Sequence, residues 1–180
     1  FDYTDGDLID TWAFSTPATE DHSYITIDNG ELVTMGTLEE DSTHSVIQRY
    51  SLNGTLLSTI SDELEYNGYI AVDSDTNYYV SDFNGNLAKY NSSGVLQVVR
   101  GSFGTADGQL KYPEGISHDT SGNIYVLSDV IGVSNAKITK YNTSGVVQLV
   151  WNVASSPGPY IRPTQIFAQG GYVYVGTYLN

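Results

Sequence analysis

Short apolar runs rich in Ile, Val, Leu and Tyr recur along this chain, separated by stretches of Asp, Asn, Ser and Gly. The segments 24–27 (YITI) and 172–175 (YVYV) are typical examples. Short runs of β-branched and aromatic residues bounded by turn residues are typical of β-strands. The period of about 3.6 residues that marks an amphipathic helix does not persist anywhere. The pattern therefore predicts an all-β protein of short strands joined by polar turns.

The strands form a repeat with two parts. The first part is an apolar strand, a turn of Asp, Asn and Gly, and a second strand, and it occurs at 24–36, 69–82, 115–129 and 165–177. The second part is a basic residue, a Tyr, a turn ending in Gly and an apolar run, and it occurs at 49–60, 89–100 and 140–151, with a looser copy at 1–12. Its turn glycines, Gly6, Gly54, Gly94 and Gly145, lie 48, 40 and 51 residues apart. Spacings of about 40–50 residues are typical of four-stranded propeller blades.

We therefore expect one β-propeller domain of four blades, each with four antiparallel strands. Residues 23–60, 68–100 and 114–151 make three complete blades, and 164–180 supplies two strands of a fourth. Because open sheet edges invite aggregation, we expect the N-terminal strands in 1–12 to complete this C-terminal blade and close the ring. Two alternatives stay open: the chain is an arc of a larger ring, or residues 1–12 complete a blade of a neighbouring subunit.

One repeat has a more specific signature. Residues 104–126 resemble an NHL repeat through Gly104, Gly108, Leu110, Pro113, Gly115, Ile116, Asp119, Gly122, Asn123, Tyr125 and Val126. The other repeats match more loosely, since 24–36 has no Pro-x-Gly lead-in and Gln169 replaces the Asp in the last copy. The resemblance implies a propeller, although familiar NHL propellers usually have six blades. It implies no particular activity.

Charge narrows the range of partners. Seven basic against 21 acidic residues give a net charge of −14, which disfavours nucleic acid and anionic lipid surfaces. No apolar run is long enough to cross a bilayer, and there is no Cys. Abundant Tyr, Gly, Ser, Thr and Asn with few Lys and Arg is typical of extracellular or cell-surface proteins. The chain begins with Phe1 and shows no signal peptide, so we expect a processed chain, an excised domain or an incomplete sequence.

The long connections between strands are expected on one side of the ring, at 13–22, 37–44, 61–67, 101–113, 130–135 and 152–163. Long loops on a rigid scaffold carry binding residues, and this side is acidic. The candidate binding residues are Glu39, Glu40, Asp41, His44, Asp62, Glu63, Glu65 and Glu114. We expect a protein or glycan partner here, basic in character, or a divalent cation such as calcium, and Glu114 is expected to face the central channel. A solvated acidic rim is the competing interpretation.

Metal-binding candidates are few. They are His22, His44, Asp73 and Asp75. The turn at 73–77 alternates oxygen-bearing side chains, but it lacks the Gly and Glu of an EF-hand loop, so an Asx turn is the favoured interpretation. His118 takes an apolar position and is expected to pack between blades with one ring nitrogen hydrogen-bonded. No catalytic residue is assigned, because no nucleophile elbow or phosphate loop occurs.

Three sequons, at Asn53, Asn91 and Asn142, fall in the turns of the second repeat part. They indicate either a glycoprotein or simply the residues that such turns prefer.

The leading functional hypothesis is a non-catalytic surface or extracellular propeller for adhesion, assembly or ligand binding. One alternative is an NHL-like metal-dependent lyase or hydrolase in which His22, His44 or His118 holds the metal. Another is a self-assembling structural subunit of a filament or virion.

Overall fold

The computed structural model describes residues 19–28, 30–38, 41–65, 67–128, 136–153 and 161–179. Within these ranges the chain forms fourteen strands and no helix. The first sheet contains β1 (Thr19–Asp28), β2 (Glu31–Leu38), β3 (Asp41–Ser51) and β4 (Leu56–Glu65). The second contains β5 (Asn67–Val72), β6 (Tyr78–Asp82), β7 (Asn86–Tyr90) and β8 (Leu96–Gly101). The third contains β9 (Gly115–His118), β10 (Ile124–Ser128), β11 (Lys137–Tyr141) and β12 (Val147–Asn152), and the fourth contains β13 (Ile161–Gln169) and β14 (Tyr172–Leu179).

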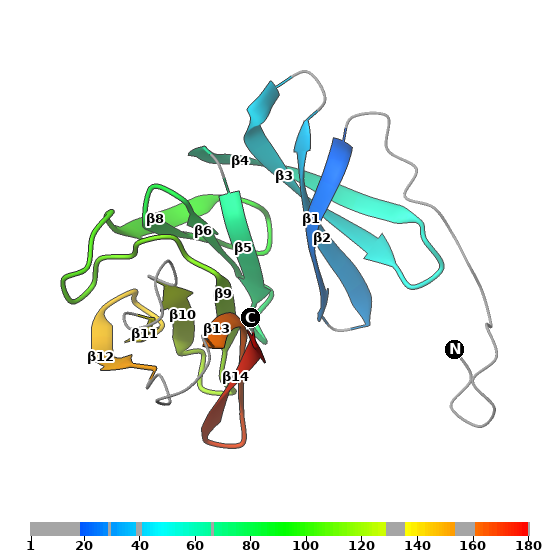
Figure 1. Cartoon of the computed structure of the whole chain (residues 1–180). Coiled ribbons are helices and arrows are strands. Elements are labelled where there is room, and N and C mark those ends of the chain that lie inside the picture. The colour runs from blue at the N-terminus through cyan, green and yellow to red at the C-terminus, as the bar shows by residue number, and fades with distance from the viewer. Residues whose placement is uncertain are drawn as a thin grey trace.

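All strand pairs are antiparallel and follow chain order, as in propeller blades. The predicted fold class is confirmed: three four-stranded sheets and one two-stranded sheet coincide with the four predicted repeats. Figure 1 shows β5, β9 and β13 near the middle of the view and β8 and β12 at its periphery. The predicted pairing of residues 1–12 with the C-terminal blade lies outside the described residues.

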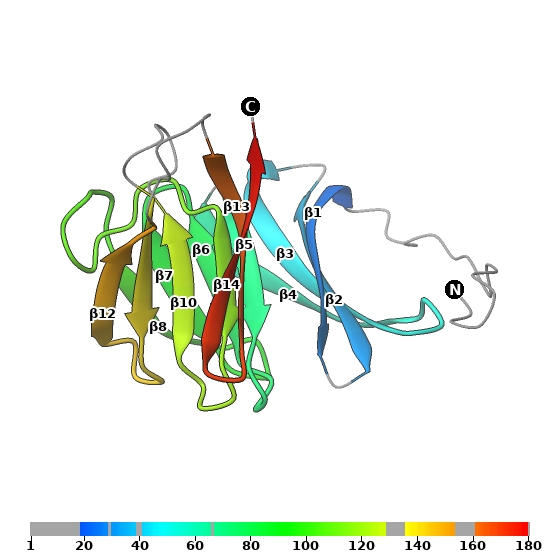
Figure 2. The ribbon, with the colours of Figure 1, turned by 60° about the horizontal axis from the view of Figure 1, so that its bottom comes forward.

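The innermost strands pack side by side in the order β1, β5, β9 and β13. Figure 2 shows that the turns joining β9 to β10 and β13 to β14 lie on the same side of the molecule. Three apolar clusters join each sheet to the next, and they centre on Val33 with Ile70, on Tyr79 with Ile116, and on Tyr125 with Ile166. Burying one large apolar side chain contributes about 1.5–3 kcal/mol. The fold is therefore held together chiefly by packing between successive sheets.

The turns of the second repeat part form as their sequence predicts. Gly54, Gly94 and Gly145 adopt φ angles of 84°, 77° and 74°, a region that glycine enters without steric cost. The repeated tyrosines Tyr50, Tyr90 and Tyr141 are fully buried. The recurring Tyr–turn–Gly pattern therefore corresponds to one buried tyrosine and one glycine with a left-handed conformation in each of the three sheets.

Part of the predicted loop face is wrong. β1 begins at Thr19, β3 begins at Asp41 and β4 continues to Glu65, so much of 13–22, 37–44 and 61–67 is strand. The register continues through polar positions, with His44 opposite Glu65 and Leu38 opposite Asp41. Backbone hydrogen bonds do not depend on apolar side chains, so a ladder started by apolar residues extends into acidic sequence. The prediction holds better for 102–114, which has no strand beyond an isolated bridge between Phe103 and Leu110, whereas 130–135 and most of 152–163 lie outside the described residues.

Candidate functional site

The four innermost strands surround a central hollow of about 420 Å³. Each strand contributes a short stretch to its wall: 24–27 from β1, 70–72 from β5, 116–118 from β9 and 166–169 from β13. Most of these side chains are apolar, and the polar exceptions include Ser117, His118 and Gln169. The repeat thus creates a channel, because the same strand of every sheet faces the same axis.

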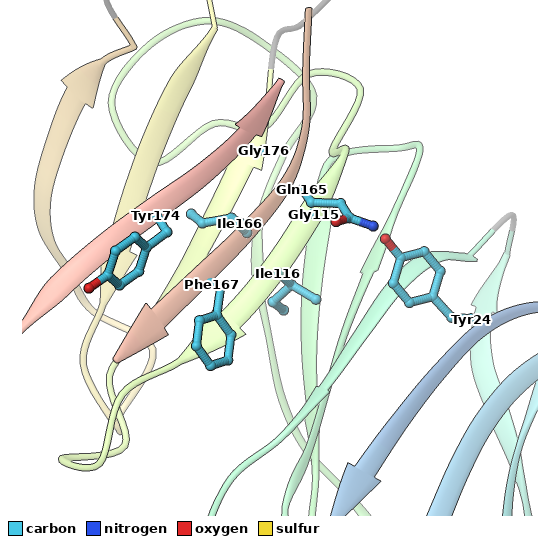
Figure 3. Close-up of a pocket in the computed structure, with 8 residues that line it drawn as sticks. All are labelled: Tyr24, Gly115, Ile116, Gln165, Ile166, Phe167, Tyr174 and Gly176. Atoms are coloured by element: carbon cyan, nitrogen blue, oxygen red, sulfur yellow. The ribbon is translucent and has the colours of Figure 1, made fainter. Parts of the chain in front are cut away.

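A second hollow of about 370 Å³ adjoins the first and shares Tyr24, Ile116, Ile166 and Phe167 with it. Figure 3 shows the Tyr24 hydroxyl pointing toward the Gln165 amide, while Phe167 and Tyr174 lie further along the wall. We call this region the channel mouth and define it by Tyr24 and Gln165, which line it, and by Tyr69 and Glu114, which lie in contact behind Tyr24. Tyr24, Tyr69 and Gln165 lie on the inner strands of three sheets, and Glu114 directly precedes the inner strand of the remaining sheet.

Equivalent backbone positions supply the channel mouth. Tyr24, Tyr69 and Gln165 stand at the same place in their inner strands, opposite Met35, Ser81 and Gly176. The third sheet has Gly115 at this place, opposite Leu127. A Cβ on Gly115 would lie 3.1 Å from Ile166 Cγ2, so the close approach of β13 favours glycine. The neighbouring Glu114 therefore supplies the polar side chain on that side.

Three of these residues are in direct contact. The rings of Tyr24 and Tyr69 meet edge to face, with centroids 4.4 Å apart. The Tyr69 hydroxyl donates a hydrogen bond of 3.2 Å to Glu114 Oε2, and the Glu114 amide donates to the Leu127 carbonyl at 2.9 Å. Burial, with help from Tyr69 and the Glu114 carboxylate, raises the pKa of Tyr24 well above its usual value. Tyr24 therefore keeps its proton at neutral pH and remains a hydrogen-bond donor.

The chemistry of the channel mouth suits recognition of a small polar molecule. It presents a protonated phenol, an amide that both donates and accepts, and a carboxylate, beside apolar and aromatic walls. Within the part of the chain that the structure describes, no three His, Asp or Glu side chains gather closely enough to hold a metal ion.

The structure separates the acidic residues that the sequence grouped together. Glu114 directly precedes β9 and accepts a hydrogen bond from Tyr69 on β5, and its orientation toward the central channel stays a prediction. Asp41 and His44 are on β3, and Asp62, Glu63 and Glu65 are on β4, the two outer strands of the first sheet. Glu39 and Glu40 lie outside the described residues. Of the candidate acids, Glu114 is the one that a described hydrogen bond links to an inner strand.

The metal candidate Asp73 has a structural role. Its carboxylate accepts hydrogen bonds from the amides of Asp75 and Asn77, from Asn77 Nδ2 and from the Tyr79 hydroxyl, at 2.9–3.1 Å. Burial alone would raise the pKa of Asp73, but these donors outweigh burial and hold it below its usual value. Both oxygens are thus engaged, which favours the Asx-turn interpretation over a metal ligand. Asp75 contributes its backbone amide to the same turn.

Asp119 repeats this arrangement one sheet further on, with Ser121, Asn123 and Tyr125 as donors. Its pKa is lowered for the same reasons, again against the effect of burial. We call Asp73 and Asp119 the turn aspartates. Asp82 differs, because there burial outweighs the hydrogen bonds from Asn86 and raises the pKa.

The histidine candidates lie on separate strands: His22 on β1, His44 on β3 and His118 on β9. His118 lines the central hollow, and its Nδ1 lies 3.3 Å from the Asp119 carbonyl oxygen. Because a carbonyl can only accept, Nδ1 carries the proton in this contact. The hydrogen bond agrees with the expectation, whereas the ring lines the central hollow and not a contact between two sheets.

The sequons occupy exposed turns but not one position. Asn91 and Asn142 begin their turns, and each side-chain oxygen accepts two backbone amides at 2.9–3.1 Å. Asn53 comes two residues later in its turn, next to Gly54, where Ser51 takes the first place. Glycosylation of these residues stays a prediction.

Tyr24, Tyr69 and Gln165 were not singled out from the sequence. The signal was present, since each one is the first residue of a copy of the first repeat part. What was missing is that such first positions converge, which requires the sheets to be arranged around an axis.

Comparison with solved structures finds many chains of similar fold. A solved gluconolactonase from Xanthomonas campestris, described as important in glucose secondary metabolism, superposes with a TM-score of 0.56 at 15% sequence identity. The match covers 85% of this chain and 52% of the gluconolactonase, so the chain spans about half the length of that protein. No family model matches the sequence, and no curated protein does. Among the described residues there is no helix long and apolar enough to cross a membrane. At this identity the likeness shows the β-propeller fold alone.

Proposed function

We propose that this chain is a ligand-binding propeller whose site is the channel mouth, and that its ligand is a small, uncharged, hydroxylated molecule such as a sugar. The observation that carries the proposal is a hollow of about 370 Å³ lined by Tyr24 and Gln165, with Tyr69 and Glu114 joined to Tyr24 by a ring contact and a hydrogen bond. Structural packing alone would be served equally well by apolar residues at these positions.

The class of ligand follows from the donors and acceptors. The Tyr24 hydroxyl donates, the Glu114 carboxylate accepts, and the Gln165 amide does both, which matches the alternating donors and acceptors of a polyol. A net charge of −14 and the carboxylate at the channel mouth disfavour anionic ligands. The aromatic ring of Phe167 and the side chain of Ile166 supply an apolar surface for the C–H face of a sugar ring.

The test is calorimetric titration with a panel of neutral monosaccharides, with gluconate as an anionic control. Gln165→Ala and Glu114→Gln should each weaken binding by about tenfold, the equivalent of one well-formed hydrogen bond. Gln148→Ala is the matched control, because Gln148 is an exposed glutamine on β12, outside the channel. Sugars that bind with unchanged affinity to all three variants would contradict the channel mouth as the site.

A second candidate function is hydrolysis of a sugar lactone, which the likeness to a gluconolactonase favours. In this case Glu114 would act on the substrate or hold a cation beside it. The test measures hydrolysis of glucono-lactone above its spontaneous rate, with and without added divalent cations. Activity that is lost in Glu114→Gln but kept in Gln148→Ala would favour the hydrolase. Sugar binding without turnover would favour the binding protein.

Surface or extracellular location, a role in adhesion and a partner on the acidic residues of the first sheet stay predictions from the sequence. A sugar-binding channel is compatible with the predicted glycan partner, because a glycan terminus carries the same hydroxyl groups.

A further inference from the structure

Two exposed phenylalanines lie on the side of the fold where the inner strands begin. Phe83 is in the turn between β6 and β7 and is 47% exposed, and Phe103 follows β8 and is 49% exposed. The start of β5 pairs with the end of β6 through Asn67 and Asp82, so the β6–β7 turn lies beside the start of β5. Figure 2 shows the loop from β8 to β9 on the side opposite the β9–β10 turn. Both rings are therefore on the side where Tyr69 leads into the channel mouth.

Close approaches within the second sheet place these rings in a row that leads outward from the channel mouth. A Cβ on Gly68, the neighbour of Tyr69, would lie 3.9 Å from two ring carbons of Phe83. A Cβ on Gly85, two residues after Phe83, would lie 2.7 Å from Phe103 Cα. The order from the channel mouth is thus Tyr69, Phe83 and Phe103. We call Phe83 and Phe103 the aromatic row.

The loop that carries Phe103 is firmly held. Leu110 is fully buried, and its amide donates to a carbonyl at the start of the loop at 2.9 Å. Two further carbonyls of the loop accept from the buried Lys137 ammonium. Tyr112 adopts a φ of 48° directly before a proline, which is a strained conformation for a residue with a side chain. Its ring meets Phe103 edge to face, with centroids 5.5 Å apart. Because Phe103 is held in place and half of it stays exposed, it is preorganised for contact with a ligand.

The surroundings of the aromatic row are polar but uncharged. Asn84 and Ser102, next to the two rings, are exposed, and 83–86 and 102–106 contain no charged residue. The face of an aromatic ring carries partial negative charge and attracts the C–H groups of a sugar, while amides and hydroxyls bond its hydroxyl groups. From β5 to the loop after β8 the row crosses two to three strand spacings, or about 10–14 Å. This length exceeds one sugar ring and suits a chain of linked rings.

We propose that the ligand is a neutral oligosaccharide whose terminal sugar enters the channel mouth and whose following units lie on Phe83 and Phe103. The proposal rests on the proposed function, because it extends the same site. It narrows the class of ligand, since the aromatic row gives a chain of sugars contacts that a free monosaccharide does not reach.

Calorimetric titration compares neutral monosaccharides with the linear trisaccharides of glucose, xylose, mannose and N-acetylglucosamine. At least one trisaccharide should bind about tenfold more tightly than its monosaccharide, the gain expected from stacking on aromatic rings. Phe103→Ala should remove most of this gain and leave monosaccharide affinity unchanged, and Phe83→Ala should act in the same direction. Phe103→Tyr should retain the gain, because it keeps the ring. Leu149→Ala is the matched control, since Leu149 is an exposed apolar residue on β12, outside the row.

Trisaccharides that bind no more tightly than monosaccharides, or that bind Phe103→Ala unchanged, would overturn this proposal and leave the channel mouth as a monosaccharide site. Trisaccharide binding that depends on Phe103 but not on Gln165 would retain the aromatic row as an oligosaccharide site and contradict the channel mouth. Absence of binding by every sugar would overturn both proposals. Self-association that is lost in Phe103→Ala by light scattering, with sugar affinities unchanged, would assign the row to an interface between copies of the chain.

Discussion

Replacing Asp73 by alanine should destabilise this protein far more than removal of one surface charge. Asp73 is 5% exposed, and its carboxylate accepts from the Tyr79 hydroxyl at 3.1 Å and from Asn77 Nδ2 at 2.9 Å. A hydrogen bond to a charged group contributes about 1.5–3 kcal/mol, and a buried donor left without an acceptor costs about 1–3 kcal/mol. Tyr79 is buried, whereas Asn77 is half-buried and can bind water. Counting the Tyr79 bond fully and the Asn77 bonds in part gives a loss of about 3 kcal/mol.

Urea unfolding followed by tyrosine and tryptophan fluorescence measures this loss. Tyr79→Phe should by itself cost about 1.5 kcal/mol, and in the Asp73→Ala background it should cost close to nothing, because its partner is already absent. Tyr125→Phe is the matched control, since Tyr125 donates to Asp119 in the equivalent turn at 2.9 Å. Its effect should add fully to that of Asp73→Ala. A loss below about 1 kcal/mol for Asp73→Ala, or additive effects of Asp73→Ala and Tyr79→Phe, would refute the reasoning.

A fall in pH, the replacement of two glycines and the replacement of one lysine provide three further tests. The turn aspartates have lowered pKa values, so the stability from their charged forms is present at pH 7 and is lost as the pH falls below about 4. Urea midpoints measured down to about pH 3 should fall, less steeply than these two groups alone require because the raised pKa of Asp82 acts in the opposite direction. Gly85→Ala should lower the free energy of unfolding in urea by at least about 2 kcal/mol, because its Cβ would lie 2.4 Å from a backbone carbonyl oxygen. Gly30→Ala should lower it by about 1 kcal/mol, because nothing lies within 4 Å of its Cβ. Equal losses for the two variants would contradict this reasoning. Buried Lys137 donates to two backbone carbonyls of 102–110 at 2.9 and 3.0 Å. Lys137→Met should therefore increase the rate of proteolysis within 102–110. An unchanged rate of cleavage would show that these two hydrogen bonds do not hold the loop in place.

The architecture could be predicted because its signals are local. A left-handed glycine such as Gly94 and a buried tyrosine such as Tyr90 recur at blade spacing, and each needs only its own hairpin to be recognised. The Asx turn at Asp73 was likewise readable, since its donors lie within six residues along the chain.

The site was harder to predict because its geometry is not local. Tyr69 and Glu114 are 45 residues apart and meet only after the second and third sheets pack together. The acidic residues around His44 illustrate the opposite error. Charge suggested loops, but the register of β3 with β4 continues through them, because ladder hydrogen bonds are made by the backbone.

The strictly sequential order of strands within every sheet has a consequence for how the protein forms. Each sheet pairs only strands that follow one another in the chain, so its loop-closure entropy is small and it can assemble as soon as it is synthesised. Sheets then influence one another only through their immediate neighbours, as units in a linear array do. Among the sheets that the structure describes, β13–β14 has the fewest strands, so partial unfolding should begin there and spread to the neighbouring sheets one at a time.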